Sequence, residues 1–178
     1  MNWRPLLLLL MLGLLPACSM IDPADTRTTQ QQWYDTQIEM AIGGLANKPP
    51  YRQQTRINAI AVDGKVLLVG QAIDPAISRQ LEQQVHELNH VTVVYNQLQI
   101  RPLPQLSEVS EDSWITMKVK TQLIGSKRLS NTSIKVVTEG QAVYLLGYVS
   151  HEQGNTAADI ARNVSGVKKV VKVFEYPQ

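Results

Sequence analysis

The sequence contains a single cysteine, Cys18, among 178 residues. One cysteine cannot form a disulfide within the chain, and it cannot build a zinc site from several thiolates. An excess of one charge is also lacking, since 17 Lys and Arg face 15 Asp and Glu and give a net charge of +2. This balance excludes a strongly basic nucleic-acid-binding protein. With 44% hydrophobic residues, the chain is typical of one large or two small globular domains.

The sequence offers little that accompanies enzyme chemistry. It has no phosphate-binding glycine loop and no GxSxG turn. His86 and His90 lie four residues apart, a spacing that places two zinc ligands on one helical face, but no third ligand is evident. We therefore expect neither a metal site nor a cofactor, and we predict that the protein is not an enzyme.

A short apolar run near the N-terminus is typical of an export signal. It extends from Leu6 to Leu15 after the basic Arg4, and these ten residues are too few for a membrane span of about 20. The following Leu15-Pro16-Ala17-Cys18 resembles the lipobox of bacterial lipoproteins. That resemblance implies that residues 1–17 are a signal peptide and that Cys18 carries lipid as the first residue of the mature chain. The alternative is an ordinary signal peptide followed by an unmodified cysteine.

Residues 18–31 are mostly polar and lack apolar periodicity, so we interpret them as a lipidated tether. Several acyl chains at Cys18 would hold the protein firmly, because each buried CH₂ contributes about 0.8 kcal/mol. In enteric lipoproteins an aspartate after the lipidated cysteine favours retention in the inner membrane. By that resemblance, Ser19 predicts an outer-membrane protein that faces the periplasm.

The remaining sequence contains one unit twice. Ile57, Val66 and Gly70 align with Ile134, Val143 and Gly147 at a constant offset (134 − 57 = 77), and Val91 aligns with Val167 at an offset of 76. Between the copies, Pro102 and Pro104 interrupt any strand. We therefore predict two domains, 32–101 and 110–178, joined by a linker over 102–109.

Each unit has the pattern helix, strand, strand, helix, strand. Asp63-Gly64 and Glu139-Gly140-Gln141 separate aliphatic runs and predict two hairpins. In the second unit, Asp112 or Ser113 is a candidate N-cap for the first helix. The expected fold is α+β, a three-stranded mixed sheet in each unit with two helices on one face. Units of about 65 residues have marginal cores, so we expect the two to pack on each other.

The motifs VLLVG (66–70), VYLLG (143–147) and SGVKKVVKV (165–173) within this unit resemble the BON domain. Two such units behind a lipobox resemble the dual-BON lipoproteins of the Gram-negative outer membrane. The resemblance covers about residues 33–176 and implies a binding module rather than a catalyst.

One face of the second unit's first helix is a candidate lipid-binding site. Trp114, Met117, Lys118 and Thr121 recur at spacings of three and four, whereas the first copy has Gln37 in place of Trp114 (114 − 77 = 37). A tryptophan beside ammonium groups suits the headgroup region of a bilayer. The resemblance likewise implies that this helix engages anionic phospholipid such as phosphatidylglycerol or cardiolipin. Nearby basic residues that add to the site are Lys120, Lys127 and Arg128.

Burial of Trp114 against the other domain or against a loop is the structural alternative. Trp33 and Tyr34, at the start of the first unit's helix, are expected to pack in the core or between the domains. Our functional hypothesis is an outer-membrane lipoprotein that binds anionic phospholipid and supports envelope integrity. The alternatives are an adaptor that binds another envelope protein, or a peptidoglycan-associated envelope stress protein without lipid specificity.

Overall fold

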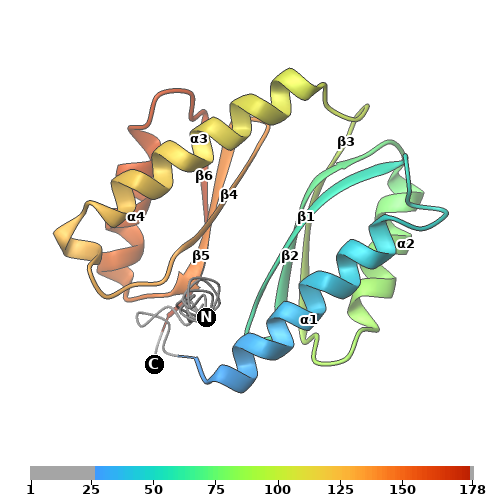
Figure 1. The fold of residues 1–178 in the computed structure, drawn as a ribbon, viewed down its shortest axis with the longest axis horizontal. Coiled ribbons are helices and arrows are strands. Elements are labelled where there is room, and N and C mark those ends of the chain that lie inside the picture. Colours follow the sequence, from blue (N-terminus) through green and yellow to red (C-terminus); the bar gives the residue numbers. More distant parts are fainter. Residues whose placement is uncertain (1–26, 177–178) are drawn as a thin grey trace, which may run out of the picture.

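The computed structural model describes residues 27–176 and contains the expected αββαβ unit twice (Figure 1). The first domain consists of α1 (Thr29–Ala46), β1 (Thr55–Val62), β2 (Lys65–Ala72), α2 (Pro75–His86) and β3 (Val93–Ile100). The second consists of α3 (Leu106–Ile124), the 3-10 helix η1 (Lys127–Leu129), β4 (Lys135–Glu139), β5 (Ala142–Tyr148), α4 (His151–Arg162) and β6 (Lys169–Glu175). The α+β fold class predicted from the sequence is confirmed.

Each domain has a three-stranded mixed sheet with its hairpin at one edge. β2 pairs antiparallel with β1 and parallel with β3, and β5 pairs in the same way with β4 and β6. The helices α2 and α4 make the crossover that a parallel pair requires. One face of each sheet packs on the two helices of its own domain, around Val66 and Leu68 in the first and around Val143 and Leu145 in the second.

A buried aspartate holds the hairpin turn in each domain. The carboxylate of Asp112 accepts hydrogen bonds from the backbone N–H groups of Gly140 and Gln141, both at 2.8 Å. Asp35, 77 residues earlier (112 − 35 = 77), does the same for the turn at Asp63-Gly64. The prediction that Asp112 or Ser113 caps the first helix of the second domain was wrong, because both residues lie inside α3, whose N-cap is Gln105, and the Asp112 carboxylate binds the turn instead.

Helix α3 begins earlier than the sequence suggested, at Leu106, within the stretch expected to be a linker. Ser110 and Ser113 lie within this extension and donate their hydroxyls to carbonyls one turn back in the same helix. At its first turn, Glu108 pairs with Arg101 at 2.9 Å. The helix therefore starts almost directly after Pro104, and Trp114 lies in its middle.

Gly70 and Gly147 are the aligned glycines that end the second strand motif of each copy. Their φ angles are 133° and 151°, which side chains rarely adopt. A Cβ on Gly70 would lie 2.0 Å from the carbonyl oxygen of Arg56, and one on Gly147 would lie 2.4 Å from that of Ser133. The close approach of the paired strand therefore requires glycine at both positions.

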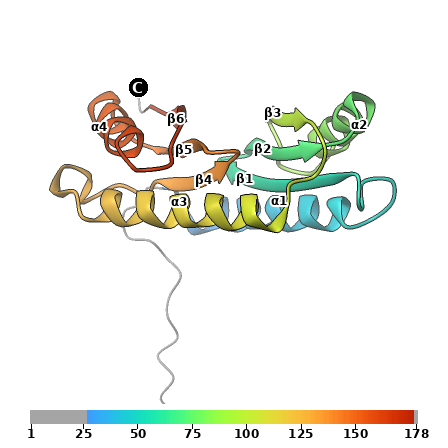
Figure 2. The ribbon, with the colours of Figure 1, turned by 90° about the horizontal axis from the view of Figure 1, so that it is seen from above.

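The two domains pack sheet against sheet, with the helices on the outside (Figure 1). Ile60, Leu67 and Val69 of the first domain form one buried cluster with Tyr144 and Leu146 of the second. Because both faces of each sheet are covered, the middle strands are apolar on both sides. Figure 2 shows that this packing brings α1 and α3 to the same level on one side of the molecule, with α2 and α4 on the other.

Polar contacts join the domains around this cluster. The carboxylate of Glu139, 1% exposed, accepts hydrogen bonds from three residues of the first domain: Arg56 (2.8 Å), Asn58 (3.1 Å) and Gln71 (2.5 Å). Two further ion pairs cross the interface, Lys135–Glu39 at 2.9 Å and Lys65–Glu175 at 2.6 Å. These directional contacts fix one relative position of the two domains.

Candidate lipid-binding surface

Helix α3 presents an apolar stripe to solvent. Its opposite face packs into the core through Ile115, Val119 and Leu123, which recur every four residues. Because successive residues turn about 100° around a helix, Trp114 and Met117 point away from that core. Trp114 is 59% exposed and Met117 55% exposed, so burial of Trp114 against the other domain is excluded.

Thr121 and Ile124 continue this stripe toward the end of α3. Thr121 is exposed and donates its hydroxyl to the carbonyl of Met117 within the helix, at 2.9 Å. Ile124, which the sequence interpretation missed, is 85% exposed. Its spacing of three from Thr121 was the signal that could have found it. Trp114, Met117, Thr121 and Ile124 together form what we call the α3 stripe.

The predicted basic residues lie around the α3 stripe but differ in their availability. Lys118 is half-buried and donates to the carbonyl oxygen of Ser165 at 2.5 Å. Arg128 pairs with Glu152 at 3.2 Å, with both side chains largely exposed. Lys120 and Lys127 are exposed and make no ion pair within residues 27–176. These two ammonium groups are therefore the ones most accessible to an anion.

The segment that contains the stripe, from Ser113 to Thr138, carries only positive charges. Residues 113–138 contain five basic residues and no acidic residue. This local excess is much larger than the net charge of +2 suggests. A cationic, partly apolar surface of this kind attracts anionic lipid headgroups through both charge and insertion.

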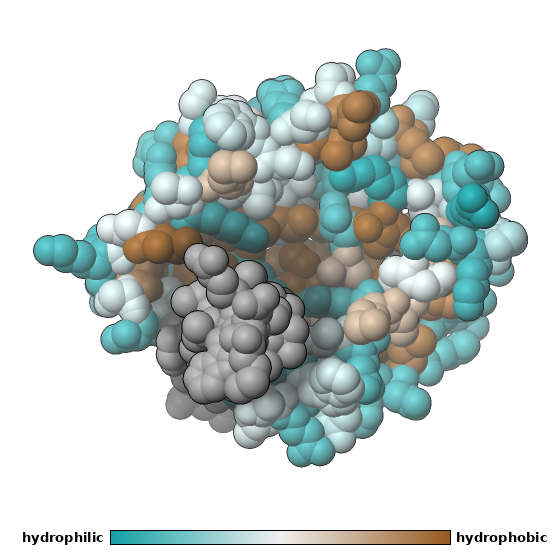
Figure 3. All heavy atoms as spheres, viewed as in Figure 1, coloured by the Kyte–Doolittle hydropathy of each residue, from teal (hydrophilic) through white to brown (hydrophobic). Residues whose placement is uncertain are grey.

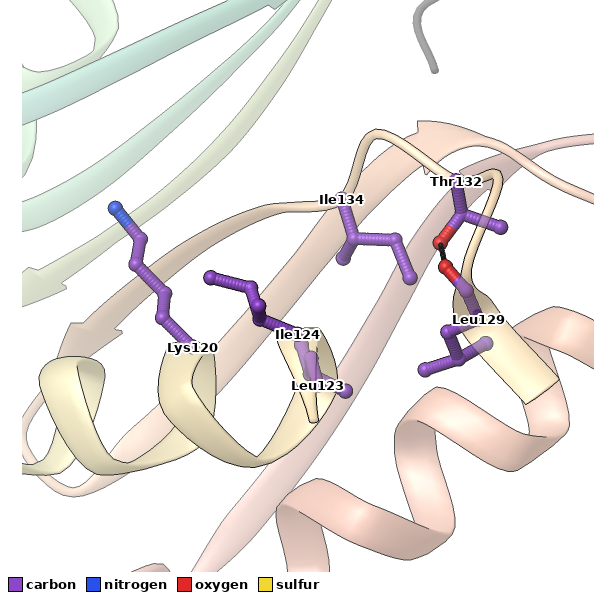
Figure 4. Close-up of a pocket in the computed structure, with 6 residues that line it drawn as sticks. All are labelled: Lys120, Leu123, Ile124, Leu129, Thr132 and Ile134. Atoms are coloured by element: carbon purple, nitrogen blue, oxygen red, sulfur yellow. Dashed lines mark hydrogen bonds between the residues drawn. The ribbon is translucent and has the colours of Figure 1, made fainter. Parts of the chain in front are cut away.

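A small pocket opens at the end of α3, beside the stripe (Figure 4). It has a volume of about 170 Å³. The buried Leu123 and Leu129 form its inner wall, whereas the exposed Lys120 and Ile124 lie at its rim. Figure 4 shows the ammonium group of Lys120 pointing away from Leu129 and Thr132. The residues that line the pocket are Lys120, Leu123, Ile124, Leu129, Thr132 and Ile134.

The first domain carries a second exposed tryptophan, which the sequence interpretation placed incorrectly. Trp33 is 60% exposed on α1 and does not pack in the core or between the domains. Its neighbour Tyr34 instead stacks on His90, with ring centroids 3.8 Å apart. The prediction failed because both residues lie beside the core-facing positions of α1, where sequence alone does not separate a buried from an exposed ring.

The two histidines considered as a zinc pair do not share a helical face. Residues 86–90 read HELNH and so fit the letters of the HExxH zinc motif. However, α2 ends at His86, and His90 has a left-handed φ of 67° at the position that Gly166 occupies in the second domain. Within residues 27–176, no group of three or more His, Cys, Asp or Glu side chains is arranged to hold a metal ion.

Cys18, the predicted lipid attachment site, lies outside the described residues. Among the helices that are described, none is both long enough and apolar enough to cross a membrane.

Comparison with known proteins places this architecture in a family. The family model for the BON domain matches residues 34–102 and 111–178. The chain is 37% identical to the outer membrane lipoprotein DolP of Haemophilus influenzae over 153 residues, 85% of this chain and 79% of that protein. It is 36% identical to a 21 kDa hemolysin of Actinobacillus pleuropneumoniae over 157 residues, 88% of this chain and 81% of that protein.

Among solved structures, CdsD, a structural protein of the type III secretion system of Chlamydia trachomatis, matches with a TM-score of 0.30 and 13% identity. That match covers 80% of this chain but only 63% of CdsD. The relationship to DolP supports an envelope lipoprotein and confirms the outer-membrane localisation expected from the sequence. With both of its units matched, the chain belongs to the BON-domain family.

Proposed function

We propose that the second domain binds anionic phospholipid through the α3 stripe and the basic residues around it, and that this binding helps to maintain the envelope. The observation that carries the proposal is the exposure of Trp114 and Met117 within a segment that has five basic residues and no acidic one. The indole would lie at headgroup depth, with the neighbouring ammonium groups on lipid phosphates. The protein acts by binding and has no catalytic activity of its own.

The electrostatic contribution to the binding free energy depends on how many basic side chains have no partner within the protein. Near an anionic membrane each basic residue contributes about 1 kcal/mol. Since Lys118 and Arg128 already have partners, we count only Lys120 and Lys127, which gives about 2 kcal/mol or roughly 30-fold in affinity. Insertion of Trp114 must add to this, because charge of that size alone gives weak binding.

We further propose that Cys18 carries the lipid anchor and that residues 18–31 tether the domains to the outer membrane. The anchor would hold the protein at the bilayer, and α3 would then select anionic lipid within reach. Phosphatidylglycerol and cardiolipin both carry the required phosphate charge. The competing function is that of an adaptor, with the same stripe bound to another envelope protein.

Vesicle binding distinguishes these functions. We expect Trp114→Glu to lower cosedimentation with phosphatidylglycerol vesicles by about tenfold or more, because it removes the inserted ring and adds a repelled charge. Gln80→Glu adds the same charge at an exposed site on α2, on the far side of the molecule in Figure 2, and should bind like the wild type. If wild type ignores anionic vesicles, or if Trp114→Glu binds them unchanged, the adaptor function is favoured.

A charge test completes the design. We expect Lys120→Gln with Lys127→Gln to lower affinity for anionic vesicles about 30-fold. The control combines Arg79→Gln and Lys172→Gln, two exposed cations of α2 and β6 on the far side of the molecule, and should change affinity less than about threefold. Equal losses in the two double variants would contradict a local site.

A further inference from the structure

Helix α1 of the first domain has an apolar stripe that matches the α3 stripe. Trp33 is 60% exposed and Met40 72% exposed, and their spacing of seven places both on one face of the helix. In the repeat, Met40 aligns with Met117 (117 − 40 = 77). Trp33 aligns with Ser110, one turn before Trp114. Each helix therefore carries one tryptophan and one methionine along the same outward line, although the tryptophans are not at equivalent positions.

The exposed side of α1 carries no unpaired carboxylate. Asp35 is buried against the hairpin turn and paired with Arg27. Glu39 accepts from the backbone N–H of Ala61 and from Lys135 across the domain interface. No charge on this helix would therefore repel an anionic surface. The exposed residues of α1 are Thr29, Gln30, Trp33, Thr36, Gln37, Met40, Ala41, Gly43 and Gly44.

Domain packing places the two helices on the same side of the molecule. Figures 1 and 2 together show that α1 and α3 run in opposite directions on the same side of the molecule. The edge strands β1 and β4 lie between the two helices. On this face, Figure 3 shows apolar residues in the hollow between the helices within a largely hydrophilic rim. Because polar contacts fix the two domains relative to each other, a flat surface that meets α3 also comes close to α1.

The length of the tether favours a bilayer as the occupant of this face. From Cys18 to Arg27 the chain advances by nine residues (27 − 18 = 9), which span at most about 32 Å when fully extended. Since α1 begins two residues later, its first turn cannot lie far from the lipid anchor. The helix nearest to the anchor is thus one that exposes tryptophan and methionine and no free acid.

We propose that α1 lies on the same phospholipid surface as α3, with Trp33 and Met40 in the headgroup region, so that the protein rests on the membrane along both helices. This inference rests on the proposed function, because it assigns α1 to the same bilayer. Two contacts with one surface prevent the rigid pair of domains from tilting about α3. The contact also adds apolar area to binding that two free ammonium groups alone leave weak.

The chain provides its own reporters for a test. Its three tryptophans are Trp3, Trp33 and Trp114, and Trp3 precedes Cys18 and is absent once the signal peptide is removed. The processed, lipidated chain therefore has two tryptophans, Trp33 in α1 and Trp114 in α3. Trp114→Phe leaves Trp33 as the sole reporter, and Trp33→Phe leaves Trp114. Each variant is reconstituted into phosphatidylglycerol-containing vesicles with or without bromine on the acyl chains, which quenches indole at contact.

We expect the fluorescence of each reporter to fall about twofold in brominated vesicles, as for an indole held at the membrane interface. Quenching of Trp114 without quenching of Trp33 overturns this inference and leaves the proposed function intact. Quenching of Trp33 alone supports contact by α1 and overturns the role of α3. Quenching of neither overturns both.

A second measurement does not use the tryptophans. Met40→Glu should lower binding of the unlipidated Cys18→Ser chain to anionic vesicles by about fivefold or more, because it adds a repelled charge and removes an inserted side chain. The control is again Gln80→Glu, exposed on α2, and circular dichroism checks that both variants fold. Equal binding of the two variants refutes the contact of α1.

Discussion

The buried carboxylate of Glu139 allows a quantitative test of how the domains are held together. Arg56→Met keeps much of the side-chain stem but removes the only cation that contacts this carboxylate in the described structure. The Glu139 side chain is 2% exposed, whereas that of Arg56 is 31% exposed. After the substitution, Asn58 and Gln71 still donate to the carboxylate, but its charge is unpaired.

Breaking a fully buried ion pair costs about 3–5 kcal/mol. Because water reaches part of the Arg56 side chain, we lower the expected cost to about 2–3 kcal/mol. In a chain of this length, 1 kcal/mol corresponds to about 2–4 °C in Tm, so Tm should fall by about 4–12 °C. Urea unfolding and calorimetry of the unlipidated chain measure both quantities.

The double variant Arg56→Met with Glu139→Gln separates an unpaired charge from lost packing. A neutral amide in place of the carboxylate leaves no buried charge, so the double variant should recover about half of the stability that Arg56→Met loses. Glu139→Gln alone provides the fourth corner of the cycle. A cost below about 0.5 kcal/mol for Arg56→Met, or strictly additive costs, would refute the reasoning.

Three other predictions concern single sites. Gly147→Ala should destabilise by more than about 3 kcal/mol in thermal unfolding because its Cβ would meet a backbone oxygen at 2.4 Å, whereas Gly43→Ala, with nothing within 4 Å, should stabilise α1 by about 1 kcal/mol. Equal effects would contradict the clash. Asp112→Ala should cost about 2–3 kcal/mol in urea, since two turn N–H groups lose their acceptor, and an unchanged midpoint would exclude that role. Burial, with a contribution from the charge of Glu139, raises the pKa of Tyr144 above 10.0, so the folded state keeps the proton that the unfolded state loses. Stability should therefore fall as the pH rises above about 10, less steeply in Tyr144→Phe, and identical slopes would refute this.

Local chemistry made much of the fold predictable from the sequence. The turns at Asp63-Gly64 and Gly140-Gln141 require left-handed backbone conformations that few residues adopt, so their residue types located both hairpins. The beginning of α3 was not predictable in this way. Asp112 has the residue type of an N-cap, and only the position of the facing hairpin shows that its carboxylate serves a turn instead.

The sequence indicates that the middle strand of the first domain is covered on both faces, but it does not identify what covers the second face. The run from Val66 to Val69 lacks alternation, as expected for a strand covered on both faces. The run does not say what covers the second face, because that depends on the other sheet. For the same reason, the periodicity of α3 predicted that Trp114 lies off the core, while the exposure of Trp33 required the structure.

The ion pairs between the domains are not repeated within the duplicated unit. Each of their six charged residues aligns with an uncharged residue in the other half. The correspondences are Arg56 with Ser133, Glu139 with Val62, Lys65 with Ala142, Glu175 with Gln99, Lys135 with Asn58, and Glu39 with Thr116. If two copies of the same domain packed in this arrangement, the charged residues would have no charged partner. Arg56 would face a valine in a pair of first domains, and Glu139 would face a serine in a pair of second domains. The three ion pairs can therefore form only between the two different domains. Each domain is thus complementary to the other and not to a second copy of itself.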